Sequence, residues 1–161
     1  MTSAIASDLI AGFIGTLVLS TILRTASEFG WTRMDLAFLL GTTVTVNRRK
    51  AKAIGYAIHF LLGMLFAMAY GAFFAVVDHS SWWLGAILGA LHAVFISTVL
   101  VNILLPVVHP RMGTPETAAN EIALVEPPGF LMLNYGRNTF LITFLAHIAY
   151  GIVVGLTIRG I

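Results

Sequence analysis

The chain has 161 residues, of which 58% are hydrophobic and only 10% are charged, and its mean hydropathy is +0.93. Soluble domains contain about 25% charged residues, so this chain has too little polar sequence to cover its long apolar runs in water. Cysteine is absent, which excludes disulfides and thiolate metal sites. The net charge of +2 is less informative than its distribution along the chain.

Four uncharged stretches predict transmembrane helices at about residues 5–24, 53–77, 81–105 and 138–158. A helix needs roughly 20 mostly apolar residues to cross the bilayer core. The first stretch reaches that length only if Asp8 lies at the lipid headgroups. It could instead be a cleaved signal peptide, although no Lys or Arg precedes it. Continuous rather than alternating runs argue against a β-barrel. We therefore expect an all-α membrane protein, a four-helix bundle forming one membrane domain over residues 1–161.

The first predicted helix and the loop after it carry two further signals. Small residues spaced along the helix predict a close contact with another helix; they are Gly12, Gly15, Thr16 and Ser20. The segment Trp31–Val46 is too short to span. It predicts a short helix at the membrane interface with Asp35 capping it or near its start, and a re-entrant turn is the alternative.

The second and fourth predicted helices each carry a histidine within a ladder of small residues. Steps of four place each ladder on one helical face. The ladders are Gly55–His59–Gly63 and Thr143–His147–Gly151. A third histidine, His92, lies roughly in the middle of the third helix. Ionisable residues inside a bilayer are costly, so these three are the candidate functional residues.

The chain also predicts an internal duplication. At an offset of 77 residues, Leu19-Ser-Thr-Ile-Leu23 aligns with Ile96-Ser-Thr-Val-Leu100, and Gly12 aligns with Gly89. Each copy then reaches a histidine ladder. We expect two parallel two-helix repeats, residues 1–78 and 79–161, related by an axis along the membrane normal.

The duplication makes a geometric prediction about the histidines. His59 and His147 are expected at one depth, facing each other if both ladders point toward the axis. Asp35 and His92 have no counterparts in the other copy, so any function that uses them is asymmetric.

Basic residues predict the orientation, because loops rich in Lys and Arg remain in the cytoplasm. Most basic residues fall in the loops 25–52 and 106–137 or at their edges, which should therefore be cytoplasmic, with both termini outside. In the second loop, Thr114-Pro115-Glu116 predicts the start of a short helix to about Leu124. Phe130–Tyr135 predicts a second interfacial stretch.

Three short motifs carry a family resemblance. They are Arg33-Met-Asp-Leu-Ala-Phe-Leu-Leu-Gly41, His109-Pro-Arg-Met-Gly113 and Leu145-Ala-His-Ile-Ala-Tyr-Gly-Ile-Val-Val-Gly155. With these motifs, nearly the whole chain resembles a group of small bacterial four-helix membrane proteins of unassigned function. The resemblance implies a bacterial inner-membrane location and the four-helix topology, and it supplies no activity and no binding residues.

The sequence leaves several functions open. The leading interpretation is a non-enzymatic structural or accessory subunit of a larger membrane complex, which would bind the lipid bilayer and other subunits or itself, and no nucleic acid. The alternative is haem or metal binding, with haem b held axially by His59 and His147, or a metal held by these two together with His92. A small transporter is a further alternative. An enzyme at the cytoplasmic face could use Asp35, His109 and Glu116.

Overall fold

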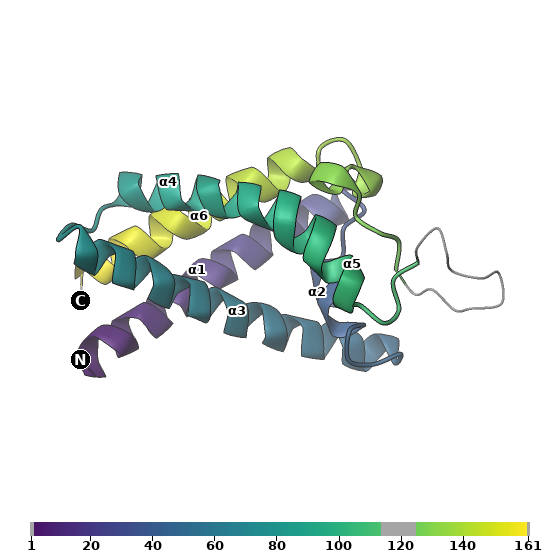
Figure 1. The fold of residues 1–161 in the computed structure, drawn as a ribbon, viewed down its shortest axis with the longest axis horizontal. Helices are drawn as coiled ribbons and strands as arrows, with labels where there is room; N and C mark the ends of the chain where they lie inside the picture. The colour runs from purple at the N-terminus through teal and green to yellow at the C-terminus, as the bar shows by residue number, and fades with distance from the viewer. Residues whose placement is uncertain (1, 114–124, 161) are drawn as a thin grey trace.

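The protein consists of long helices joined by short helical elements (Figure 1). The computed structural model describes residues 2–113 and 125–160. In chain order the elements are α1 (Thr2–Glu28), α2 (Leu36–Gly41), α3 (Arg48–Val76), α4 (Trp82–Phe95), η1 (Ile96–Leu104), α5 (Leu105–Val108), η2 (Phe130–Tyr135) and α6 (Thr139–Gly160). The segments α4, η1 and α5 follow one another without a break and together form the third long helix.

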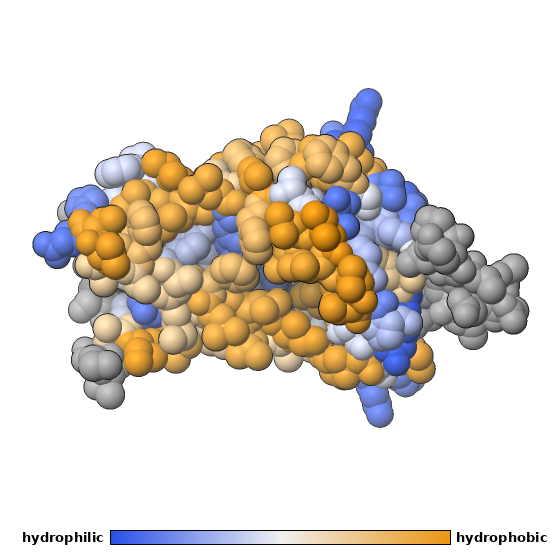
Figure 2. All heavy atoms as spheres, in the orientation of Figure 1, coloured by the Kyte–Doolittle hydropathy of each residue, from blue (hydrophilic) through white to orange (hydrophobic). Residues whose placement is uncertain are grey.

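Within the described residues, four helical segments are long and apolar enough to cross a membrane, and each overlaps one of the four predicted helices. They are Ala4–Glu28, Arg48–Val76, Trp82–Val108 and Thr139–Ile158. Figure 2 shows mostly hydrophobic residues over the middle of the molecule and hydrophilic ones gathered toward its two ends. This distribution is the one a bilayer-spanning bundle requires, because only apolar side chains are cheap to expose to lipid tails.

The helix ends differ from the predicted ones. The first helix continues beyond Arg24, which pairs with Glu28 one turn later at 2.7 Å. The second begins at Arg48 rather than at residue 53, because the Asn47 side chain caps it by accepting a 3.1 Å hydrogen bond from the Lys50 N–H. The third passes Pro106, which follows the junction where the π-helical stretch η1 gives way to α5.

Both chain ends lie at one end of the bundle, and α2 and α5 lie at the other (Figure 1). The charged residues of the 25–52 loop and Arg111 belong to the end that carries α2, which we call the basic end. Two loops at one end and two termini at the other are what four consecutive crossings produce.

The long helices pack as two antiparallel pairs, α1 with α3 and α4 with α6, and α1 also packs along α6. Glycine makes the α4–α6 pair close. Gly85 lies against the carbonyl of Gly151, and Gly89 lies against the carbonyl of His147, so that a Cβ at either glycine would collide with backbone. The small-residue ladders of the sequence are therefore helix–helix contacts within the chain.

The two pairs pack in different registers. The offset of 77 residues makes Gly89 correspond to Gly12. Aligning the two ladders on His59 and His147 makes Gly155 correspond to Ala67. Gly12 does pack on Ala67, but Gly89 packs on His147 rather than on Gly155. The duplication stays a prediction, and equal depth of the two ladder histidines does not follow from the helix contacts.

The short elements close the basic end of the bundle. Asp35 caps α2 as predicted, accepting a 3.0 Å hydrogen bond from the Phe38 N–H. α2 packs tightly on α3, because Gly41 and Gly55 leave room for the backbone across the contact. Its predicted position at the membrane interface is untested, and the predicted helix from Thr114 to Leu124 lies outside the described residues.

The second predicted interfacial stretch is the 3-10 element η2. Leu131 and Met132 within it have φ values of 51° and 59°, in the left-handed region that non-glycine residues rarely adopt. Met132 is almost completely buried and reaches the interior of the bundle.

Candidate functional site

One cavity of about 70 Å³ between the helices brings the three candidate histidines together. His59 comes from α3, His92 from α4 and His147 from α6. We call this space the three-histidine cavity. Its remaining walls are mostly apolar and come from α1, α2, α3, η1 and η2; they include Leu19, Leu39, Leu62, Phe66, Ile96, Leu100, Val101 and Met132. A mostly apolar cavity with a few convergent polar groups is the usual form of a binding site for small molecules.

His147 is held in one tautomer by its own helix. Its Nδ1 lies 2.8 Å from the carbonyl oxygen of Thr143. Because a carbonyl oxygen can only accept, Nδ1 carries the hydrogen and donates it, and in the neutral ring Nε2 is then an acceptor. The side chain is buried, with 6% of its surface exposed. Its helix also packs closely on Gly89, which fixes the position of the ring.

His92 lies directly beside His147. The centroids of the two rings are 4.9 Å apart and the rings are inclined at 78°. The Nδ1 of His92 lies 3.3 Å from the Tyr70 hydroxyl, and the Phe66 ring packs on the imidazole with centroids 3.9 Å apart. Two aromatic side chains of α3 therefore position this histidine of α4.

Several buried polar atoms around the cavity have no hydrogen-bond partner within the described structure. Three belong to cavity-lining side chains, namely His59 Nε2, His92 Nε2 and Thr143 Oγ1. Buried polar groups are nearly always paired with protein, water or a ligand. A space of this size holds several water-sized groups, since one water needs about 10–15 Å³ by this kind of measure. The unpaired atoms make the cavity a candidate site for a polar group.

The structure places two of the three histidine rings side by side, those of His92 and His147. His59 and His147 line the same cavity, and their predicted facing arrangement stays a prediction. Over residues 2–113 and 125–160, no three His, Asp or Glu side chains are placed to hold a metal ion. The cavity is also small beside the roughly 300–1,000 Å³ of typical ligand sites, so haem b would require the helices to separate. Haem and metal binding stay predictions.

Tyr70 and Tyr150 belong to the site although sequence reasoning did not select them. Tyr150 lines the cavity and donates a 2.6 Å hydrogen bond to the Gly63 carbonyl, which ties α6 to α3. Its ring lies 5.7 Å from that of Tyr70, centroid to centroid. Helical spacing could have identified Tyr150 as a site residue, because it follows His147 by three residues and so lies on the same helical face.

Asp35 and His109, two of the three residues proposed for enzymatic chemistry, lie at opposite ends of α2. Asp35 stands at the start of α2, where it forms a 2.6 Å ion pair with Lys52. His109 lies at the end of α2, where its Nδ1 accepts from the Arg111 N–H and its Nε2–H donates to the Leu39 carbonyl at 3.1 Å. Burial lowers the pKa of His109 below its usual value. Glu116 lies outside the described residues.

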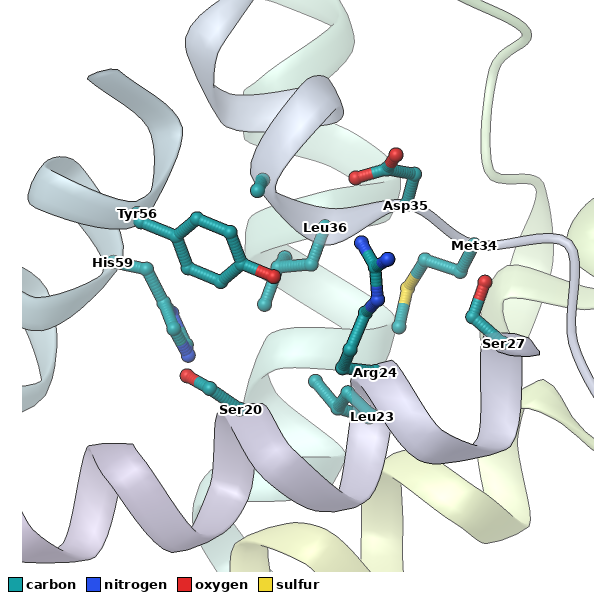
Figure 3. Close-up of a pocket in the computed structure, with 10 residues that line it drawn as sticks. Ser20, Leu23, Arg24, Ser27, Met34, Asp35, Leu36, Tyr56 and His59 are labelled. Carbon is teal, nitrogen blue, oxygen red and sulfur yellow. The ribbon is translucent and has the colours of Figure 1, made fainter. Parts of the chain in front are cut away.

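A second, smaller space of about 30 Å³ adjoins the cavity at the basic end (Figure 3). We call it the polar pocket; its polar lining residues are Ser20, Arg24, Ser27, Asp35, Tyr56 and His59. In Figure 3 the Ser20 hydroxyl points toward the His59 ring, and Arg24 rises between Met34 and the Tyr56 hydroxyl. His59 lines both spaces.

The fold and the site define a multi-pass helical membrane protein with a histidine-lined internal cavity. The chain belongs to a family of unknown function, DUF6789, whose model matches residues 2–161. This match confirms the resemblance to an uncharacterised family, while a bacterial origin stays a prediction. A search of curated proteins and a search of solved structures found no match.

Proposed function

We propose that this membrane protein binds a small lipophilic molecule that presents a hydrogen-bond donor, such as a hydroxyl group, to the three-histidine cavity. The observation that carries the proposal is the tautomer of His147. Its Nδ1–H is used by the Thr143 carbonyl, so its Nε2 accepts a hydrogen bond from whatever lies in the cavity. The apolar walls suit the rest of such a molecule.

The unpaired nitrogens of His59 and His92 support the same assignment. Each neutral imidazole can donate or accept through Nε2, so the two can satisfy further polar atoms of the ligand. A neutral ligand fits the site better than an ion, because the surrounding side chains are apolar and a charge transferred into them loses most of its hydration. The small volume means that only the polar end of a larger molecule fits without movement of the helices.

The accessory-subunit interpretation is the second candidate. It rested on small-residue ladders as contacts with other proteins, but Gly85, Gly89 and Gly151 are packed within the chain. What faces outward is a set of large apolar side chains, which suit lipid and a neighbouring subunit equally; they include Leu61, Leu65, Leu91, Leu141 and Leu145. Purification from native membranes in a mild detergent tests this candidate. If no other protein ever copurifies with the chain, the accessory-subunit interpretation is wrong. The transporter alternative stays a prediction.

A pair of probes with matched shapes tests the binding function. p-Cresol and p-xylene differ only in a hydroxyl in place of a methyl group. We expect p-cresol to bind the purified protein more tightly, because one hydrogen bond contributes about 0.5–1.5 kcal/mol, or roughly 2–12-fold in Kd. Isothermal titration calorimetry in detergent measures both affinities. Equal affinities for the two probes, or no binding of either, contradict the proposal.

The variant His147→Leu identifies the acceptor. Leucine has a similar size but no Nε2 acceptor, so the preference for p-cresol over p-xylene should disappear. The matched control is His79→Leu, since His79 lies exposed in the turn between α3 and α4. That variant should keep the preference. A preference that survives in His147→Leu assigns the hydrogen bond to another group.

We further propose the bacterial inner membrane as the location, with both termini outside and the two long loops in the cytoplasm. The support is the concentration of Lys and Arg at the end of the bundle that carries α2. Positive charge near helix ends keeps a loop on the cytoplasmic side.

A further inference from the structure

The three-histidine cavity and the polar pocket are neighbours that share part of their walls. His59, Leu23, Met34 and Leu36 line both spaces. Two of these four side chains are easily displaced, because methionine is unbranched and flexible and a histidine ring turns about two bonds. The partition between the spaces therefore consists of side chains rather than backbone.

The polar pocket reaches the surface at the basic end. Asp35 and Arg24 line it, and Lys52 pairs with Asp35; the exposed fractions of the three side chains are 36%, 51% and 48%. Charged side chains with this exposure lie in water or among lipid headgroups, not among lipid tails. The pocket thus connects the basic surface with the edge of the cavity.

Unpaired polar atoms mark the connection itself. Ser20 Oγ on α1 and His59 Nε2 on α3 are both buried and both lack a partner within the described residues. The Ser20 hydroxyl points toward the His59 ring from across the pocket (Figure 3). A water or a passing hydroxyl group between them would satisfy both atoms, which an apolar seal at this position would not require.

We infer that the polar pocket is the entrance to the three-histidine cavity, and that His59 and Met34 are the side chains that open and close it. The inference rests on the proposed binding function for the identity of the molecule that enters, an uncharged hydroxyl-bearing compound. Such a molecule enters from the headgroup region of the basic end.

The cysteine-free chain allows a direct test, with Thr143→Cys as a reporter in the cavity wall. The permanently charged reagent 2-(trimethylammonio)ethyl methanethiosulfonate is added to sealed vesicles of each orientation. We expect it to modify the reporter only from the side that carries Arg24 and Lys52. The small permeant reagent methyl methanethiosulfonate should modify it from both sides, which shows that the thiol is reactive.

Blocking the entrance completes the test. In the reporter background, Ser20→Leu fills the pocket beside His59, and we expect modification by the charged reagent to be lost while the permeant reagent still reacts. Thr21→Leu is the matched control, because Thr21 is the exposed neighbour on the same helix and should leave the reaction unchanged. Ser27→Leu, nearer the pocket rim, serves if Ser20→Leu does not fold.

The outcomes separate the entrance from the binding function. Modification from the opposite side, or modification that neither block slows, overturns the entrance. Because the cysteine reaction needs no ligand, this result would leave the preference for p-cresol intact. Conversely, the cysteine reporter could react as expected in a protein that binds neither p-cresol nor p-xylene. That result would support the entrance as a water-filled path and contradict the proposed ligand.

Discussion

At the scale of single residues, His109 differs from His59 and His92 in how its buried ring nitrogens are paired. His109 has protein partners on both ring nitrogens and holds the end of α2 in place. His59 and His92 each keep an unpaired, buried Nε2 at the cavity. A packing role accounts for His109, because every polar atom is satisfied. It does not account for His59 and His92, since an unsatisfied buried group costs about 1–3 kcal/mol.

The pH dependence of stability should reveal the structural role of His109. Burial lowers its pKa in the folded protein below the value of 6.5 expected in the unfolded chain. Below pH 6.5 the unfolded chain therefore binds more protons, and stability falls as the pH falls until the folded-state pKa is reached. We expect a lower Tm at pH 5 than at pH 8, and a smaller difference in His109→Gln, which keeps a donor and an acceptor but does not titrate.

The exposed His79 provides the control for this experiment. His79→Gln should leave the difference in Tm between pH 5 and pH 8 as in the wild type. Thermal unfolding followed by circular dichroism in detergent measures all three proteins. If His109→Gln and His79→Gln change the difference equally, His109 does not contribute through its burial.

The candidate residues were visible in the sequence, but their arrangement was not. A histidine in an uncharged run is conspicuous because ionisable groups are rare there, so His59, His92 and His147 could all be selected. Their partnership depends on helix rotation and register. His92 approaches His147 because Gly89 lets α4 and α6 meet at backbone distance. The duplicated ladders suggested the other pair.

At the scale of elements, glycine contacts decide how the helices meet. Gly85 of α4 faces the carbonyl of Gly151 on α6, and Gly151 faces the carbonyl of Gly85. Reciprocal contacts of this kind leave no room for a side chain on either helix. The same contact positions the lining residues of both helices, so the shape of the cavity depends on it.

Gly85→Ala should therefore destabilise the bundle. The added methyl group must displace the backbone of α6, and overpacking of this kind costs about 1–3 kcal/mol or more. The control is Ile87→Ala on the same helix, where the side chain is half exposed and the change should have little effect. Unfolding in a denaturing detergent titration measures both. Equal stability of the two variants would show that α4 and α6 are not in backbone contact.

The element boundaries were predictable only in part. Length and hydropathy were enough for four spans, and Asp35 marked the start of α2 because a short acceptor side chain caps a helix. The nine-residue π-helical stretch η1 had no sequence signal. It supplies Ile96, Leu100 and Val101 to the cavity wall, and π segments often accompany functional sites.

At the scale of the whole molecule, the arrangement in the membrane follows from the order of the helices and from the charges. α3 has 29 residues, which at 1.5 Å per residue is about 43 Å, longer than a bilayer core of roughly 30 Å. It is therefore long enough for its two ends to lie on opposite sides of a membrane. The basic residues at the start of α3 predict which end is cytoplasmic.

Two single-cysteine variants at the ends of α3 test this arrangement. Lys50→Cys lies in the first turn of the helix, and His79→Cys lies in the turn after its end, both at exposed positions. We expect an impermeant maleimide to label position 79 in intact cells and position 50 only in inverted membrane vesicles. The absence of native cysteine removes background labelling. Labelling of both positions from one side would show that α3 does not cross, and labelling in the reverse pattern would place the basic end, with the polar pocket and its entrance, on the outer face.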